Sequence, residues 1–156
     1  MFPFAADAVR NLNQAGLPVI VVTNQSGVAR GYFPESLVQE VNQLMKQQLE
    51  AESAHIVATY YCPHGTADAC NCRKPKTGLL DSAATEHQLD LARSFVVGDR
   101  YGDVQLARNA GARSVMVRTG YGEGEILWHS AKWPSQPDYI ANDLAAAAEW
   151  IVSQSR

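Results

Sequence analysis

Short apolar runs that alternate with longer amphipathic segments constrain the fold of this chain more than any other feature. The run Pro18 to Thr23 (PVIVVT) is continuous and β-branched, which is typical of a parallel strand buried on both faces. The pattern predicts further strands at 55–61, 95–97, 114–117 and 138–141, and helices at 6–14, 34–52, 77–86, 101–109 and 144–153. Strands and helices in alternation imply right-handed crossovers. We therefore expect an α/β fold, a three-layer Rossmann-like parallel sheet with helices on both faces.

Two details of this prediction can be checked directly against a structure. The helix at 34–52 is expected to bury one apolar face, made of Leu37, Val41, Leu44, Met45 and Leu49. The segment 120–137 reads as a long polar loop to which we assign no role.

Length and charge limit what the protein can be. The 156 residues suit a single domain spanning 1–156, with 46% hydrophobic and 19% charged residues. A net charge of −3 argues against nucleic-acid or anionic-membrane partners. No apolar run approaches the roughly 20 residues of a membrane span, and the N-terminus lacks the pattern of a secretory signal. We expect a cytoplasmic monomer.

Polar residues and glycine follow three of the predicted strands, at the edge of the sheet where ligands of α/β proteins bind. The groups concerned are Thr23 with 24–26, the pair Arg73-Lys74, and the turn 98–103. Because the carboxyl ends of parallel strands meet at one edge, these residues should lie together.

The residue types at this edge suit phosphate chemistry, although each has a simpler explanation. The Thr23 hydroxyl and the amides after it can bind phosphate oxygens, or Thr23 can simply end its strand. Lys74 and Arg73 offer cationic donors, or belong to a solvated loop. Asp99 can bind Mg²⁺ while Asp103 holds Lys74, or both can cap a helix.

The stretch CPHGTADACNC contains every cysteine of the chain. Cys62, His64, Cys70 and Cys72 form a Cys₃His set, which is enough for a closed tetrahedral zinc site without an open position for substrate. A disulfide between Cys70 and Cys72, or free thiols, are the competing interpretations. We expect structural zinc in a loop spanning 62–72.

Taken together, VVTNQSGVARGYF, YYCPHGTADACNCRKPKTG and VVGDRYGDVQLARNAGA resemble the haloacid-dehalogenase superfamily of phosphatases. Within it, the chain is most similar to the heptose bisphosphate phosphatases, with histidinol-phosphate phosphatases as near relatives. The resemblance covers nearly the whole chain. It implies a Mg²⁺-dependent phosphoric monoester hydrolase that acts on a small sugar bisphosphate in lipopolysaccharide precursor synthesis, or alternatively on histidinol phosphate.

The resemblance also implies roles for individual residues. Thr23 and Lys74 would stabilise the phosphoryl group, and Asp99 would bind Mg²⁺ with Asp103 in support. The substrate would be bound by Thr23, Asn24, Gln25, Ser26, Arg73, Lys74 and Arg100. Cys62, His64, Cys70 and Cys72 would hold the zinc.

One departure from the family pattern concerns the nucleophile. The family opens with a central strand ending in Asp-x-Asp-Gly-Thr, and the one acidic residue before Thr23 is Asp7, within a predicted helix. We therefore expect an N-terminally truncated domain with a gap between the strands 18–23 and 95–97, and negligible turnover. A catalytically inactive, zinc-stabilised binding domain is the remaining alternative.

Overall fold

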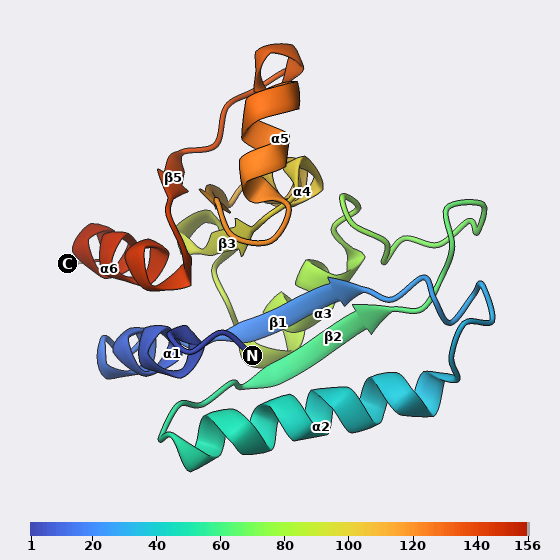
Figure 1. Cartoon of the computed structure of the whole chain (residues 1–156), viewed down its shortest axis with the longest axis horizontal. Helices are drawn as coiled ribbons and strands as arrows, with labels where there is room; N and C mark the ends of the chain where they lie inside the picture. Colours follow the sequence, from blue (N-terminus) through green and yellow to red (C-terminus); the bar gives the residue numbers. More distant parts are fainter. Residues whose placement is uncertain (156) are drawn as a thin grey trace.

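The computed structural model describes residues 1–155, and its elements follow the predicted alternation (Figure 1). The elements are α1 (Ala5–Gln14), β1 (Ile20–Asn24), α2 (Glu35–Ala51), β2 (Ala58–Cys62), α3 (Gly78–His87), η1 (Leu91–Arg93), β3 (Phe95–Gly98), α4 (Tyr101–Ala110), β4 (Arg113–Val117), α5 (Gly122–His129), η2 (Ser130–Lys132), β5 (Tyr139–Ala141) and α6 (Leu144–Gln154). Every predicted strand and helix is present, with ends shifted by a few residues.

The strands form two separate parallel sheets. β1 pairs with β2, and β3, β4 and β5 pair in that order. No pairing joins β1 to β3 among the described residues, so each of these strands has one unpaired edge. The predicted gap between these two strands is confirmed.

Backbone alternation shows which groups lie on the unpaired edges. The Gln25 amide donates to Cys62 O, and the Val57 amide donates to Val19 O, so odd-numbered residues of β1 face β2. Because successive residues of a strand point in opposite directions, Val22 faces the other side. In the other sheet, the Arg113 amide donates to Ser94 O, so even-numbered residues of β3 face β4 and Val97 lies on the unpaired edge of β3.

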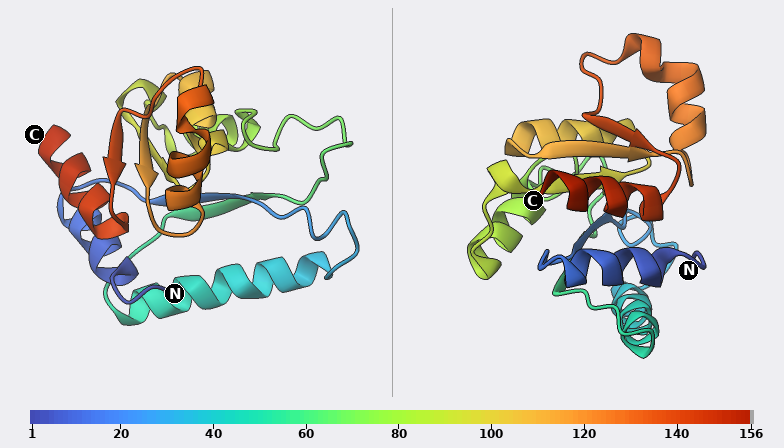
Figure 2. Two further views of the ribbon diagram at one scale, coloured as in Figure 1. Left: turned by 45° about the horizontal axis from the view of Figure 1, so that its top comes forward. Right: turned by 90° about the vertical axis from the view of Figure 1, so that its left-hand side faces the viewer.

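Helices cover both faces of the strands (Figure 2). On one face α1 contributes to two cores, one shared with β4, β5 and α6 and one shared with the C-terminal part of α2. On the other face α3 and α4 bury Leu80 and Leu106 against Val96, with Val22 packed beside them. The α1 helix and the core around Val22 therefore hold the two sheets together without a shared hydrogen-bond ladder.

Two details of the sequence interpretation were wrong. The segment 120–137 contains the helix α5 and the turn η2, and α5 stands clear of the other layers at the top of Figure 1. On α2, Val38 and Leu49 are buried, whereas Leu37, Val41 and Leu44 are exposed. Of the predicted face, Leu49 is buried and Met45 packs against the core. Because Val38 in the first turn is buried as well, the buried face runs along α2 but is narrower and rotated relative to the prediction.

Within residues 1–155, none of the helices combines the length and the apolar character that a membrane-spanning segment needs.

Candidate active site

Lys74 lies beside the unpaired edge of β1, where its ammonium group contacts both β1 and the start of α4. The Nζ atom donates to Val22 O on the unpaired edge of β1 (3.2 Å) and to Asp103 Oδ1 at the start of α4 (2.7 Å). The side chains of Lys74 and Asp103 are only 18% and 9% exposed. An ammonium group has three donors, so one remains for a ligand anion. The predicted contact between Asp103 and Lys74 is confirmed.

Asn24, the last residue of β1, fixes the backbone of Lys74. Its side-chain Nδ2 donates to Lys74 O (3.2 Å), and the Lys74 amide donates to Asn24 Oδ1 (3.0 Å). This reciprocal pair uses both ends of the Asn24 amide. The structure thus gives Asn24 a positioning role, and direct contact with substrate stays a prediction.

Thr23 presents a free hydroxyl proton at the same strand end. Gln25 Nε2 donates to Thr23 Oγ1 (3.4 Å), which leaves the Thr23 O–H available to donate to a phosphate oxygen. Ser26 begins the turn that follows, where its carbonyl accepts from the Arg30 amide (3.1 Å). Contact of Thr23, Gln25 and Ser26 with substrate stays a prediction.

Asp103 is buried because Gly98 leaves room for it. A Cβ atom at Gly98 would lie 2.2 Å from Asp103 Oδ2. The same oxygen accepts from the Arg100 amide (3.3 Å), so the carboxylate joins the Lys74 side chain to the backbone of the β3–α4 turn. The strand ends of β1 and β3 and the Lys74 loop thus meet at one edge, as the sequence predicts.

Asp99 and Arg100 lie beside a turn that the sequence interpretation missed. The Tyr121 amide donates to Asp99 Oδ2 (3.0 Å), and the Arg100 guanidinium carbon lies 3.6 Å from the centroid of the Tyr121 ring. Asp99 Oδ1 receives no hydrogen bond from the described residues, so it is available for a cation. The signal was present in the sequence, because Gly120-Tyr121 closely follows a predicted strand as the other site residues do.

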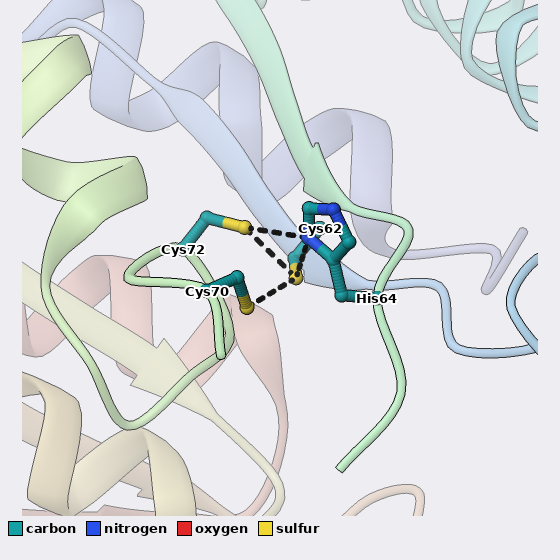
Figure 3. Close-up of side chains that lie close together, drawn as sticks. All are labelled: Cys62, His64, Cys70 and Cys72. Atoms are coloured by element: carbon teal, nitrogen blue, oxygen red, sulfur yellow. Dashed lines mark hydrogen bonds between the residues drawn. The ribbon is translucent and has the colours of Figure 1, made fainter. Parts of the chain in front are cut away.

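The Cys₃His set comes together on one side of the loop after β2 (Figure 3). One ligand atom from each of Cys62, His64, Cys70 and Cys72 lies within 4.8 Å of the others. The Sγ atom of Cys62 is 3.0 Å from that of Cys72 and 3.8 Å from that of Cys70, and His64 Nδ1 is 3.2 Å from Cys72 Sγ. Two sulfurs bound tetrahedrally to one zinc at about 2.3 Å lie about 3.8 Å apart, so the set fits a metal ion.

The thiols of Cys70 and Cys72 have strongly shifted pKa values. Although desolvation raises the pKa of Cys70, backbone hydrogen bonds from Arg73 and Cys72, with the neighbouring thiols, lower it to about 6. Desolvation and the hydrogen bonds with Cys62 and Cys70 raise the pKa of Cys72 to about 12. The cluster of closely packed sulfurs thus readily loses one proton and becomes negatively charged. A bound cation would neutralise this charge.

The cysteine loop is tied to the cationic residues that follow it. Arg73 Nη1 donates to His64 O (3.1 Å), so the arginine folds back across the loop. The α3 helix begins against the loop as well, because the Gly78 amide donates to Asn71 O (3.1 Å) and a Cβ atom at Gly78 would lie 2.5 Å from that oxygen. The loop therefore sets the position from which Lys74 reaches the edge of the sheet.

The family of this chain follows from comparison with known proteins. The model for haloacid dehalogenase-like hydrolases matches residues 1–108, and a related HAD-hydrolase-like model matches residues 71–147. The chain belongs to the haloacid dehalogenase-like hydrolase family, and its enzyme class is that of the phosphoric monoester hydrolases.

Relatives within this family narrow the comparison. The chain is 43% identical to D-glycero-D-manno-heptose-1,7-bisphosphate 7-phosphatase of Thermosynechococcus vestitus, with 97% of this chain and 82% of the relative covered. It is 36% identical to D-glycero-beta-D-manno-heptose-1,7-bisphosphate 7-phosphatase of Escherichia coli, over 96% and 80% of the two chains. Among solved structures, D,D-heptose 1,7-bisphosphate phosphatase of B. bronchiseptica, complexed with magnesium and phosphate, superposes with a TM-score of 0.88. It is 34% identical, over 98% of this chain and 84% of that one.

Proposed function

We propose that this chain binds D-glycero-D-manno-heptose 1,7-bisphosphate for hydrolysis to the 1-phosphate, in the cytoplasm and as a monomer, on the route to lipopolysaccharide precursors. The observation that carries the proposal is the mostly buried side chain of Lys74, whose ammonium group donates to Asp103 and whose backbone is fixed by Asn24, at the strand end that also presents Thr23. The substrate follows from the relatives named above, which carry that activity. The grouping of all thiols at one site suits a reducing compartment.

In this proposal the chain's own residues bind and orient the reacting phosphate. The third donor of Lys74 and the Thr23 hydroxyl contact its equatorial oxygens, where charge gathers during in-line transfer. Asp99 would hold Mg²⁺ through Oδ1, and the ion would balance the charge of the phosphate. Arg73 and Arg100 would contact the rest of the substrate, which fixes the direction of approach.

Zinc would occupy the Cys₃His set in a structural role. The four ligand atoms leave no open coordination position, so the ion would hold the 62–72 loop rather than activate water. Through the contact between Arg73 and His64 O, the bound loop would keep Lys74 in place.

The nucleophile is the remaining requirement. Transfer to an aspartate followed by hydrolysis of the aspartyl-phosphate needs an acidic residue in line with the phosphate. The sequence 1–156 contains no Asp-x-Asp pair. The Lys74 ammonium contacts Val22 O on the unpaired edge of β1 and Asp103, which packs against Gly98 at the end of β3. Because β1 and β3 each have an unpaired edge, we propose that the active enzyme has a nucleophile-bearing strand between them.

Complementation with a peptide tests this function. A synthetic peptide of β-branched apolar residues ending in Asp-x-Asp-Gly-Thr is added to the purified chain with Mg²⁺ and the heptose bisphosphate, and phosphate release is measured. We expect release only with both components, and loss of release when the first aspartate is Asn or when Lys74→Met is used. Release by the chain alone at the same rate would contradict the need for an added strand, and no release with any strand peptide would contradict the proposed function.

A further inference from the structure

The segment 120–137, which the sequence interpretation left without a role, is anchored to the β3–α4 turn at both of its ends. At its start, the Tyr121 amide contacts Asp99, and the Tyr121 ring lies against Arg100. At its end, the Trp133 ring stacks on Tyr101, with ring centroids 4.9 Å apart and planes 13° from parallel. Three consecutive residues of the turn, 99 to 101, are therefore held by one segment.

The start of the segment requires glycine because it approaches Asp99 so closely. Gly120 has a φ of +67°, and a Cβ atom there would lie 2.2 Å from Asp99 Oδ2. A side chain at Gly120 would therefore displace either the Asp99 carboxylate or the Tyr121 amide that donates to it. The backbone of the turn is thus built around the Asp99 carboxylate.

Arg100 is held on two sides but keeps its donors. The guanidinium carbon lies over the Tyr121 ring, 3.6 Å from its centroid. Its Nη1 atom is 3.6 Å from Glu125 Oε1, which is an ion pair beyond normal hydrogen-bond length. The Arg100 side chain is 52% exposed, so the planar fork remains open to an anion from solvent.

Asp103 links the side chain of Lys74 to the backbone of Arg100. Its Oδ1 accepts from Lys74 Nζ and its Oδ2 accepts from the Arg100 amide. Lys74 is the buried cation of this pair and Arg100 is the exposed one. We infer that a ligand with two phosphates has one at the mostly buried Lys74 and the other at the exposed Arg100.

We propose that Tyr121 is a positioning residue that holds Arg100 as the receptor for the second, non-reacting phosphate of the substrate. An arginine already stacked on a ring loses less rotamer freedom when it binds a phosphate than one that is free in solvent. Tyr121 thereby sets the preference for a bisphosphate over a monophosphate. The inference rests on the proposed function, because it takes a sugar bisphosphate as the ligand.

Calorimetric titration separates this role from a purely structural one. Heptose 1,7-bisphosphate and heptose 7-phosphate are titrated into the chain without Mg²⁺, and the ratio of their dissociation constants is compared between variants. We expect Tyr121→Ala to reduce the preference for the bisphosphate by about three- to fivefold, Tyr121→Phe to retain it, and affinity for the monophosphate to stay unchanged. In an Arg100→Ala background, Tyr121→Ala should have no further effect.

A control and an independent readout complete the test. Trp128→Ala removes an aromatic side chain that is 77% exposed on α5, the helix that begins directly after Tyr121. This variant should leave the ratio of the two dissociation constants unchanged. In NMR spectra, the Tyr121 ring should shift the resonance of the Arg100 Nε–H proton upfield. In Tyr121→Ala this resonance should return to the position usual for an exposed arginine.

Several results would overturn the proposal. These are an unshifted Arg100 resonance, an equal loss of affinity for both ligands in Tyr121→Ala, a persisting effect in the Arg100→Ala background, or equal affinity of the wild type for the two ligands. Failure of the proposed function looks different, because binding of both ligands would then be absent or insensitive to Lys74→Met while the NMR shift remained.

Discussion

Replacing Asp103 by Asn tests whether the contact between Lys74 and Asp103 is a buried ion pair on which the site depends. The substitution nearly keeps the shape of the side chain and removes its charge. Lys74 Nζ then keeps Val22 O as a partner but loses its carboxylate, at a position where its side chain is 18% exposed. Breaking one side of a buried pair costs about 3–5 kcal/mol, and partial exposure places this case near 3 kcal/mol.

Urea denaturation measures this cost. A loss of about 3 kcal/mol would lower the midpoint by about 1.5–2 M at the slope usual for small domains. The matched control is Glu123→Gln, which breaks the contact between Arg118 and Glu123. That pair also has an N–O distance of 2.7 Å, but its side chains are 42% and 50% exposed. The control should cost less than about 1 kcal/mol.

The two outcomes are distinct. If Asp103→Asn shifted the midpoint no more than Glu123→Gln, Lys74 would be well solvated, and the buried phosphate site inferred from it would be wrong. A cost for the double variant Asp103→Asn/Lys74→Met that is smaller than the sum of the single costs would confirm that the two residues act as a pair.

Three further predictions concern the loop, the turn and the C-terminal sheet. Cys70→Ser should release zinc and lower the melting temperature, measured by elemental analysis and calorimetry, whereas Ala69→Ser in the same loop should do neither; retained zinc in Cys70→Ser would contradict the Cys₃His site. Gly98→Ala should destabilise the protein by about 1–3 kcal/mol, because its Cβ would lie 2.2 Å from Asp103 Oδ2. In the control Gly102→Ala the Cβ meets nothing within 4 Å, so this variant should stabilise α4 by about 0.5–1 kcal/mol. Equal effects of the two variants in chemical denaturation would refute the close approach of Gly98 to Asp103. Although desolvation raises the pKa of Asp138, hydrogen bonds from Ser114 and the charge of Arg108 lower it overall, so its stabilising effect is complete above the unfolded pKa of about 3.9 and is lost as pH falls through the lower folded value. Asp138→Asn should therefore cost about 1–2 kcal/mol at pH 7 and progressively less below pH 4, and a cost independent of pH would argue against an ionised Asp138.

The fold was largely predictable because its strands are apolar on both faces. The run PVIVVT contributes Val21 to one core and Val22 to another, which is why it reads as continuous rather than alternating. The Cys₃His set was predictable because its ligands lie close together in the sequence and need little tertiary information.

The parts that could not be predicted depend on contacts between distant segments. Leu37, Val41 and Leu44 have helical spacing, but α2 is rotated so that Val38 and Leu49 face the core, and the three residues remain exposed. Asn24 reads as a ligand-binding residue because of its place after β1, yet its amide contacts the backbone of Lys74, 50 residues away. The segment 122–129 has few apolar residues and therefore does not predict α5, and the role of Tyr121 depends on its contact with Arg100, which lies on a different loop.

The most direct test of the phosphate site is a crystal of the chain soaked in tungstate, an anion with the shape of phosphate whose heavy atom can be located by anomalous scattering. The account predicts the strongest anomalous peak within hydrogen-bonding reach of Lys74 Nζ and Thr23 Oγ1, and its loss in Lys74→Met crystals. Bound tungstate elsewhere on the protein, with no peak beside Lys74, would contradict the phosphate site proposed for this chain.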